Sequence, residues 1–100
     1  MTNEIYIKSF LGARLWFTHY GNLKYSVFYK TLYSYDIVIA QRYNDVILIN
    51  ITDYNSKVKK HVNLLLEYIK EYNTKVIFVK DVPEDAKELR ILSKEHYIYV

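Results

Sequence analysis

A regular spacing of apolar residues between positions 58 and 72 limits the folds that this chain can adopt. Apolar side chains recur there at intervals of three and four residues, which places them on one stripe of a helix: Val58, Val62, Leu65, Ile69 and Tyr72. Asp53 or Asn55, just before the stripe, can cap its first turn. The pattern predicts an amphipathic helix over residues 56–72 that buries its stripe on a hydrophobic surface.

Short apolar runs on both sides of this helix predict that surface. Residues 37–40 and 46–51 flank a polar turn in which Asn44 can adopt a positive φ, so we expect a β-hairpin over residues 36–51. Residues 75–80 are typical of a buried strand. A capping box at 81–84, with Pro83 in the first turn, predicts a second helix over about 82–94, and residues 97–100 predict a last strand.

The first 35 residues favour strands. Residues 4–10 alternate apolar and polar side chains, residues 14–20 are apolar and aromatic, and residues 23–35 fit either one extended strand or a strand pair. The fold class is therefore α+β, in a single domain over residues 1–100. We expect one mixed sheet, in which antiparallel N-terminal strands precede a β-α-β-α-β half whose three strands are parallel through right-handed crossovers.

Composition excludes several classes of protein. The 100 residues contain no cysteine, so disulfides, thiolate zinc sites and thiol chemistry are excluded. No apolar run approaches the roughly 18 residues of a membrane span. Residues 1–30 lack the pattern of an export signal, so we expect an intracellular protein without membrane partners. The net charge of +3 permits an anionic partner but steers it weakly.

No catalytic constellation is visible, so we expect no enzyme and no cofactor. No serine lies in a glycine-flanked elbow, no pattern links a serine to a histidine, and the two glycines stand alone. The three histidines have no metal-ligand spacing. A metal-dependent nuclease would have to use Asp36, Asp45 and Asp53 with Lys57, but acids that flank a hairpin are also common turn formers.

A cluster of cations at the start of the predicted long helix is the first candidate site. Lys57, Lys59, Lys60 and His61 occupy the first turns, where the helix dipole disfavours cations and free N–H groups attract anions. Lys57 and Lys60 share one face of the helix, whereas Lys59 leans toward Asn63. These residues form either an anion site or a solvated polar face, and His61 fits a hydrogen-bonded structural role as well.

The second candidate lies in residues 23–35, within a chain that contains twelve tyrosines. Tyr25, Tyr29, Tyr33 and Tyr35 lie there among Lys24 and Lys30. Aromatic and basic side chains interleaved on a strand suit single-stranded nucleic acid. An edge strand buried in a homodimer has the same composition. Both readings, and an origin of the tyrosines in codon usage alone, remain open at this point.

One segment resembles short phage-encoded proteins of unknown function. The resemblance rests on residues 34–40 (Ser-Tyr-Asp-Ile-Val-Ile-Ala), on Tyr54 and on residues 60–63 (Lys-His-Val-Asn), and it spans residues 31–66. These proteins carry Thr where this chain has Ile37, and a run rich in hydroxyls where it has residues 56–59. The resemblance implies a viral gene product that acts in the host cytoplasm, and it implies no activity.

The leading functional hypothesis is a non-enzymatic viral accessory protein that acts by binding a host or viral macromolecule, as a homodimer. The alternative is a small basic nucleic-acid-binding protein that uses the lysines at the helix start and the strand with Tyr25 and Tyr29. A metal-dependent nuclease is the third hypothesis.

Overall fold

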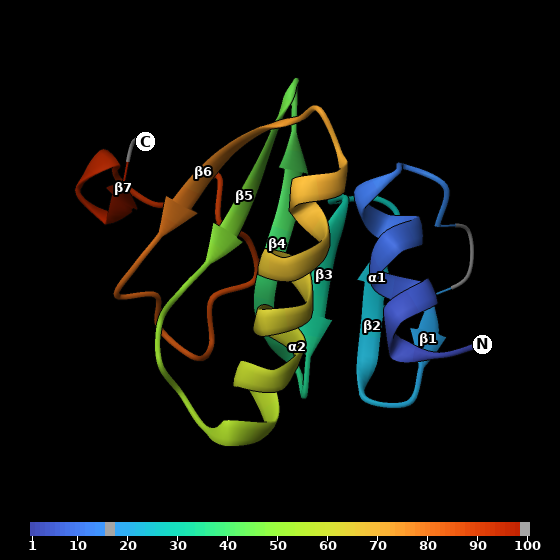
Figure 1. The fold of residues 1–100 in the computed structure, drawn as a ribbon. Coiled ribbons are helices and arrows are strands. Elements are labelled where there is room, and N and C mark those ends of the chain that lie inside the picture. The colour runs from blue at the N-terminus through green and yellow to red at the C-terminus, as the bar shows by residue number, and fades with distance from the viewer. Residues whose placement is uncertain (16–17, 99–100) are drawn as a thin grey trace.

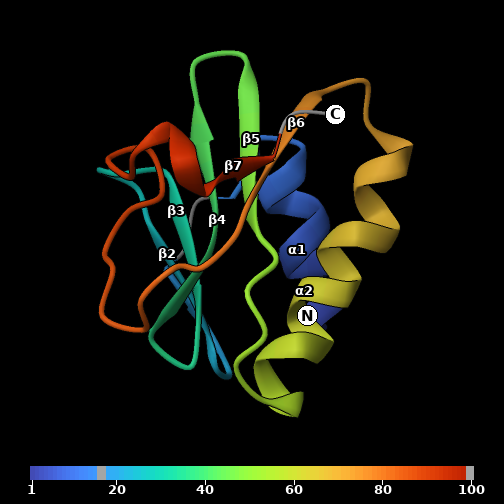
Figure 2. The same ribbon diagram turned by 90° about the vertical axis from the view of Figure 1, so that its left-hand side faces the viewer.

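The fold was determined as a computed structural model, which describes residues 1–15 and 18–98. One mixed sheet lies between two helices on one face and an irregular C-terminal segment on the other (Figures 1 and 2). The helices are α1 (Asn3–Leu11) and α2 (Ser56–Tyr68), and a 3-10 turn, η1 (Ile69–Glu71), extends α2. The α+β class with a mixed sheet is thereby confirmed.

The sheet follows the order of the chain. Its strands are β1 (His19–Tyr20), β2 (Leu23–Ser26), β3 (Thr31–Ser34), β4 (Ile37–Tyr43), β5 (Val46–Asn50), β6 (Lys75–Val79) and β7 (Tyr97–Ile98). Each strand pairs with its successor, antiparallel in every case except β5 with β6. The hairpin over 36–51, the strand at 75–80 and a strand pair within 23–35 are confirmed.

Helix α2 forms where the apolar stripe predicts it. The Asn55 side chain accepts hydrogen bonds from the backbone N–H groups of Lys57 and Val58, both at 3.0 Å, which caps the helix. Val58 and Leu65 are buried against the sheet, with 1% and 0% of their surface exposed. Helix α2 connects β5 to β6, which pair in parallel. This is the one parallel crossover of the sheet among the described residues.

The prediction of a strand over residues 4–10 is wrong, because these residues form α1. Thr2 caps this helix by accepting from Ile5 N–H at 3.1 Å. Tyr6 and Phe10, four residues apart, are buried against the sheet, whereas Ile5 is half exposed. The alternation of Ile5 and Ile7 therefore concealed a helical stripe that runs through Tyr6 and Phe10. Within the predicted strand over 14–20 only His19–Tyr20 are strand, and residues 16 and 17 lie outside the described part.

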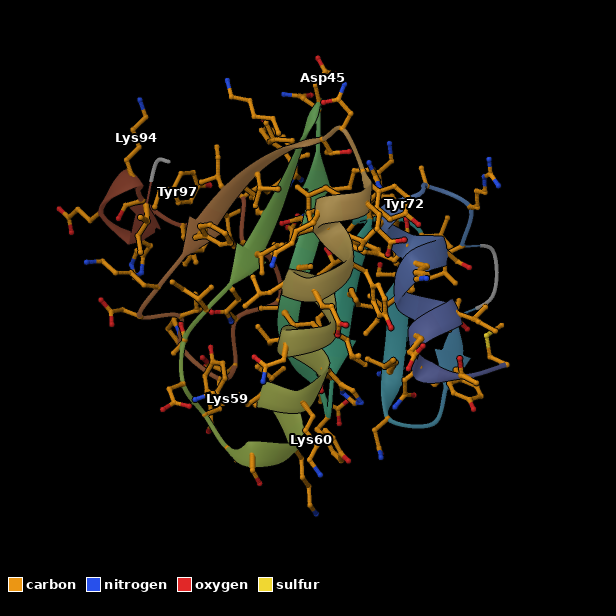
Figure 3. The ribbon with its side chains drawn as sticks, viewed as in Figure 1. Asp45, Lys59, Lys60, Tyr72, Lys94 and Tyr97 are labelled. Atoms are coloured by element: carbon orange, nitrogen blue, oxygen red, sulfur yellow. The ribbon has the colours of Figure 1, made fainter. Side chains whose placement is uncertain are left out.

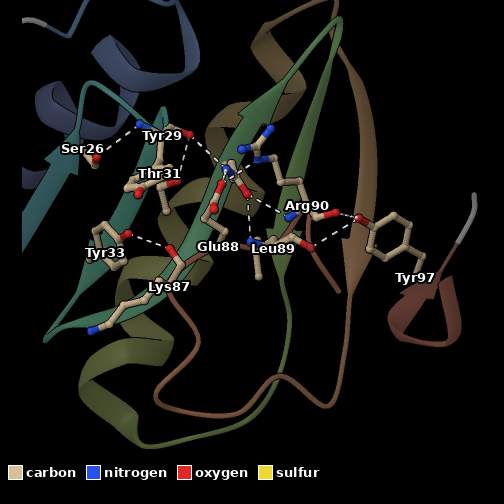
Figure 4. Close-up of polar contacts among 10 residues, drawn as sticks. Ser26, Tyr29, Thr31, Tyr33, Lys87, Glu88, Leu89, Arg90 and Tyr97 are labelled. Carbon is tan, nitrogen blue, oxygen red and sulfur yellow. Dashed lines mark hydrogen bonds and ion pairs between the residues drawn. The ribbon is translucent and has the colours of Figure 1, made fainter. Parts of the chain in front are cut away.

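The predicted helix over 82–94 is also wrong. Val82, Ala86 and Leu89 have helical spacing, but the segment crosses the sheet as irregular turns and ends in a 3-10 turn, η2 (Lys94–His96). Its backbone makes isolated turn bonds, such as Ala86 N–H to Pro83 O and Leu92 N–H to Leu89 O, and other backbone groups bond to side chains of the sheet. Gln41 Oε1 accepts from the N–H groups of Leu89 and Arg90, at 2.8 and 2.9 Å (Figure 4).

Without that helix there is no second parallel crossover, so three parallel strands were a wrong expectation. The chain turns back after β6, and β7 pairs antiparallel with it through Val79 opposite Tyr97 and Phe78 opposite Ile98. The predicted strand at 97–100 is confirmed at Tyr97–Ile98, and its last two residues lie outside the described part.

Alternating side chains of the central strands build a core on each face of the sheet. Ile47 and Ile49 of β5 pack with the helices, whereas Leu48 faces Val82 and Leu89 of the irregular segment. All of these side chains are at most 3% exposed. The period of two thus places the helices and the irregular segment on opposite faces. Neither described helix has the length and apolar character needed to cross a membrane.

Candidate anion-binding surface

A hollow of about 600 Å³ lies at the start of α2. The residues that line it include Asn3 of α1, Tyr35 of the β3–β4 turn and four side chains of α2: Lys57, Lys60, His61 and Asn63. Three elements far apart in the sequence therefore meet here. Two of the predicted lysines and the predicted histidine belong to this one surface.

The charge of this hollow is positive and uncompensated. The first turn of α2 contains no acidic residue, and because Asn55 accepts from the N–H groups of Lys57 and Val58, the lysine ammonium groups supply the positive charge there. Among the residues that the structure describes, neither Lys57 nor Lys60 has a carboxylate within ion-pair distance. The Lys57 ammonium lies 5.8 Å from the centroid of the Tyr35 ring. An anion that enters the hollow would meet both ammonium groups.

Tyr35 reaches the hollow from a tight turn with strained backbone. Ser34 pairs with Ile37, so the turn has two residues, Tyr35 and Asp36, and both have positive φ, at 50° and 66°. Such turns favour Asn-Gly, and a bulky side chain in this region is strained. The ring remains 38% exposed and stacks on the His61 ring, with centroids 5.8 Å apart and planes at 18°.

His61 is the buried floor of the hollow, with 6% of its surface exposed. The Asn3 amide nitrogen lies 3.4 Å from its Nε2 and the Ser34 hydroxyl bonds to its Nδ1. Since an amide nitrogen can only donate, Nε2 accepts and Nδ1 carries the proton. Burial lowers the pKa of His61, which favours this neutral ring. The structural role considered for His61 is thus supported by its contacts.

The contact between Ser34 and His61 was not foreseen from the sequence, where nothing links the two residues. It lacks the arrangement of a nucleophilic pair. Ser34 is fully buried, and in this tautomer Nδ1–H donates to the hydroxyl instead of removing its proton. The Asn3 amide contacts the other ring nitrogen of His61, at the position where a catalytic triad has a carboxylate. The pair therefore fixes the β3–β4 turn against α2.

Lys59 lies on a different side of α2 from Lys60, as Figure 3 shows. It lines a smaller hollow with Asn63, as its helical position predicts, and its ammonium lies 4.0 Å from Asp53. Both partners are more than half exposed, so the pair contributes little to stability. Lys59 therefore lines a different hollow from Lys57, Lys60 and His61, with Asn63 on the wall of both.

The residues of the second candidate site, in residues 23–35, do not share one surface in the structure. The Tyr25 ring packs edge-on against Phe10 in the core, 5.8 Å between centroids, and burial raises the pKa of its phenol. Tyr25 is thus no stacking platform. Tyr29 is exposed in the β2–β3 turn, where Phe28 packs against it. Lys30, also in this turn, is exposed and lines neither the hollow at the start of α2 nor the hollow with Lys59.

Lys24 lies between two further hollows on the β2–β3 side of the molecule. One, of about 220 Å³, is lined by residues that include His19, Lys24, Tyr35 and Asp36. The other, of about 420 Å³, has walls formed by Lys24, Ser26, Tyr29, Tyr33, Asp36 and Lys87. The Lys24 ammonium lies 3.4 Å from an Asp36 carboxylate oxygen, in an exposed pair. Tyr35 lines both the hollow at the start of α2 and the hollow of about 220 Å³, and Lys24 and Asp36 line both the hollow of about 220 Å³ and that of about 420 Å³.

The acids considered for a nuclease do not converge. Asp36 and Asp45 lie in the turns at opposite ends of β4, and Figure 3 shows Asp45 far from the start of α2. Within residues 1–15 and 18–98, no three His, Asp or Glu side chains are grouped as metal ligands. The nuclease hypothesis therefore gains no support from the positions of these residues.

Asn3 and Lys87 are surface residues that sequence reasoning did not select. Tyr35 was part of the aromatic set in residues 23–35, but its place in a two-residue turn with positive φ was not foreseen. Asn3 and Lys87 carried no local signal, since their elements were predicted as a strand and a helix. No family model matches the chain, and no curated protein and no solved structure matches it either.

Proposed function

We propose that this protein is a non-enzymatic viral accessory protein that acts by binding an anionic host or viral macromolecule at the start of α2. One observation carries the proposal: Lys57 and Lys60 line the same hollow and have no carboxylate partner among the described residues. Cations at a helix start oppose the helix dipole. Their presence there is explained if an anion occupies the hollow.

Binding of a generic polyanion tests this proposal. Heparin is titrated against the wild type, against the double variant Lys57→Gln/Lys60→Gln and against the control Lys70→Gln/Lys94→Gln, which has the same net charge. We expect the first double variant to weaken heparin binding by about tenfold at low salt, and the control to leave it within about twofold. An equal loss in both variants would show that net charge alone acts, and would overturn the proposed surface.

The viral part of the proposal is supported by the resemblance of residues 34–40 and 60–63 to phage-encoded proteins. The residues of that resemblance meet in space, since Ser34 bonds to His61 and Tyr35 stacks on it. The gene neighbourhood is the test. We expect flanking genes for virion or viral replication proteins, and a gene embedded in a cellular operon would contradict this part.

We also propose that the protein is a homodimer, joined through the tip of the β2–β3 hairpin. Three consecutive apolar residues are exposed there: Val27 at 58%, Phe28 at 85% and Tyr29 at 41%. Contiguous exposed apolar residues are unusual unless another surface covers them. Sedimentation at micromolar concentration tests the proposal, with a mass of two chains as the expected result.

A further inference from the structure

We infer that the anionic partner is a single-stranded nucleic acid, whose phosphates follow a row of lysines and whose bases stack on exposed tyrosine rings. The inference rests on the proposed function, because it names the partner of the same surface. We define the lysine–tyrosine track as the residues along the three adjoining hollows that carry this role: Lys60, Lys57, Tyr35, Lys24, Tyr29 and Lys87.

The continuity of the track is the first argument. Tyr35 lines both the hollow at the start of α2 and the next one, and Lys24 lines both that hollow and the third. The path therefore leads from α2 across the β3–β4 turn and along the β2–β3 hairpin. A flexible strand can follow such a bent path, whereas an acidic patch on a folded protein would have to match its shape.

The alternation of cations and aromatic rings along the track is the second argument. Starting from α2, the track has two lysines, then Tyr35, then Lys24 with its exposed partner Asp36, then Tyr29 and Lys87, so lysines outnumber the one carboxylate among these residues. Proteins that bind single strands without sequence preference combine a positive groove with aromatic rings on which bases stack. A duplex keeps its bases stacked on each other and would leave these rings unused.

The backbone of Tyr35 is the third argument. Positive φ at Tyr35 and Asp36 is retained in a turn that Asn-Gly would form with less strain. The strain presents a 38% exposed ring at the point where two hollows meet. Strained positions of this kind cluster at ligand sites, because the geometry they hold is the one that binding needs.

Fluorescence anisotropy with labelled oligothymidylate and oligouridylate of about 12 nucleotides tests the inference. We expect both to bind wild type more tightly than a duplex of the same length, with affinity falling steeply between about 50 and 200 mM salt. Tyr35→Asn should weaken binding by about tenfold, since it removes a stacking ring, while Tyr35→Phe keeps the ring and the affinity. Because Asn tolerates positive φ, the Tyr35→Asn loss cannot come from a strained turn.

Lys24→Gln should lower the slope of log affinity against log salt by about 0.7, the value for one phosphate contact in a single strand, and the control Lys70→Gln should leave it unchanged. Tighter binding of the duplex, or equal affinities for Tyr35→Asn and wild type, would overturn the inference. If heparin binds through Lys57 and Lys60 but neither oligonucleotide does, the inference fails and the proposed function stands. If Lys57→Gln/Lys60→Gln and its control lose heparin affinity equally, both the inference and the proposed function fail.

Discussion

At the scale of single residues, hydroxyl groups account for much of the tyrosine content. The sequence predicts half-buried or interface roles from composition, but five of the eleven tyrosines that the structure describes donate a hydrogen bond to a backbone carbonyl elsewhere in the chain: Tyr20, Tyr33, Tyr54, Tyr72 and Tyr97. Three of these carbonyls belong to the irregular segment after β6. For Val82 and Lys87, which lie outside helices and strands, the tyrosine hydroxyl supplies the hydrogen bond that regular secondary structure would otherwise provide.

Tyr54 should show this role most clearly. Its hydroxyl donates to Val82 O at 2.6 Å and accepts from the Asn50 side chain at 2.9 Å. Tyr54→Phe leaves both groups unsatisfied, so we expect a loss of about 1–2 kcal/mol in the free energy of unfolding, measured by urea denaturation. Tyr43→Phe is the control: its ring is 42% exposed, and the change should stay within about 0.5 kcal/mol. Equal effects of the two variants would contradict this account.

His61 should make stability depend on pH. Burial lowers its pKa in the folded state below the ordinary value of about 6.5, so the unfolded chain binds a proton first as the pH falls. The stabilisation is complete above about pH 6.5 and is lost as the pH falls toward the lowered pKa. We expect the free energy of unfolding to decrease as the pH falls below about 6.5, and His61→Gln to flatten this decrease. Parallel pH curves for the two proteins would rule the role out.

At the scale of elements, the sequence predicted what local periodicity determines. Helix α2 and the β4–β5 hairpin have strong stripes and turn residues, and both are found where expected. The segment 82–94 has a helical stripe as well, yet its backbone groups bond to Gln41, Tyr33 and Tyr97 across the sheet. These partners come from distant positions, so no local pattern could reveal them. The same holds for the contact of Asn3 with His61.

Gln41 should control how firmly this segment is held. Its side chain is 1% exposed, accepts from Leu89 and Arg90 N–H, and donates to Tyr29 O and to the buried Glu88 carboxylate. Gln41→Leu removes all four bonds, so we expect destabilisation of about 3 kcal/mol or more. Hydrogen exchange of the Leu89 and Arg90 amides should accelerate more than that of β5 amides. Uniform acceleration would mean that Gln41 stabilises the whole sheet instead.

Lys57 should oppose helix stability while it serves binding. It lies in the first turn of α2, where a carboxylate is favourable and a cation is not. We therefore expect Lys57→Glu to raise the free energy of unfolding by about 0.5 kcal/mol and to weaken heparin binding at the same time. Lys70→Glu, beyond the end of α2, is the matched control for binding. A variant that is both less stable and unchanged in heparin affinity would contradict a binding role for this lysine.

At the scale of the whole molecule, the proposed binding surface and the proposed dimer contact lie along one hairpin. The Tyr35–Asp36 turn is at one end of β3, and the tip with residues 27–29 is at the other. Tyr29 belongs to both the tip and the third hollow. In a dimer joined through two such tips the Tyr29 ring would lie in the contact, so Tyr35 would be the ring of each track left open to bases, and the lysines of the two tracks would offer a single strand two binding sites.

Phe28 separates the dimer contact from the fold. Its ring is 85% exposed in one chain, so Phe28→Ser should leave the unfolding free energy within about 0.5 kcal/mol. If the tip joins two chains, Phe28→Ser should sediment as a monomer at concentrations where wild type is a dimer. The control is Ile5→Ser, which changes a 51% exposed residue on α1 and should remain dimeric. An oligonucleotide long enough to reach both tracks should bind the wild-type dimer more tightly than a short one does, because its two contacts are linked. Phe28→Ser should lose this gain in affinity. A wild type that sediments as a monomer would leave each track to bind alone.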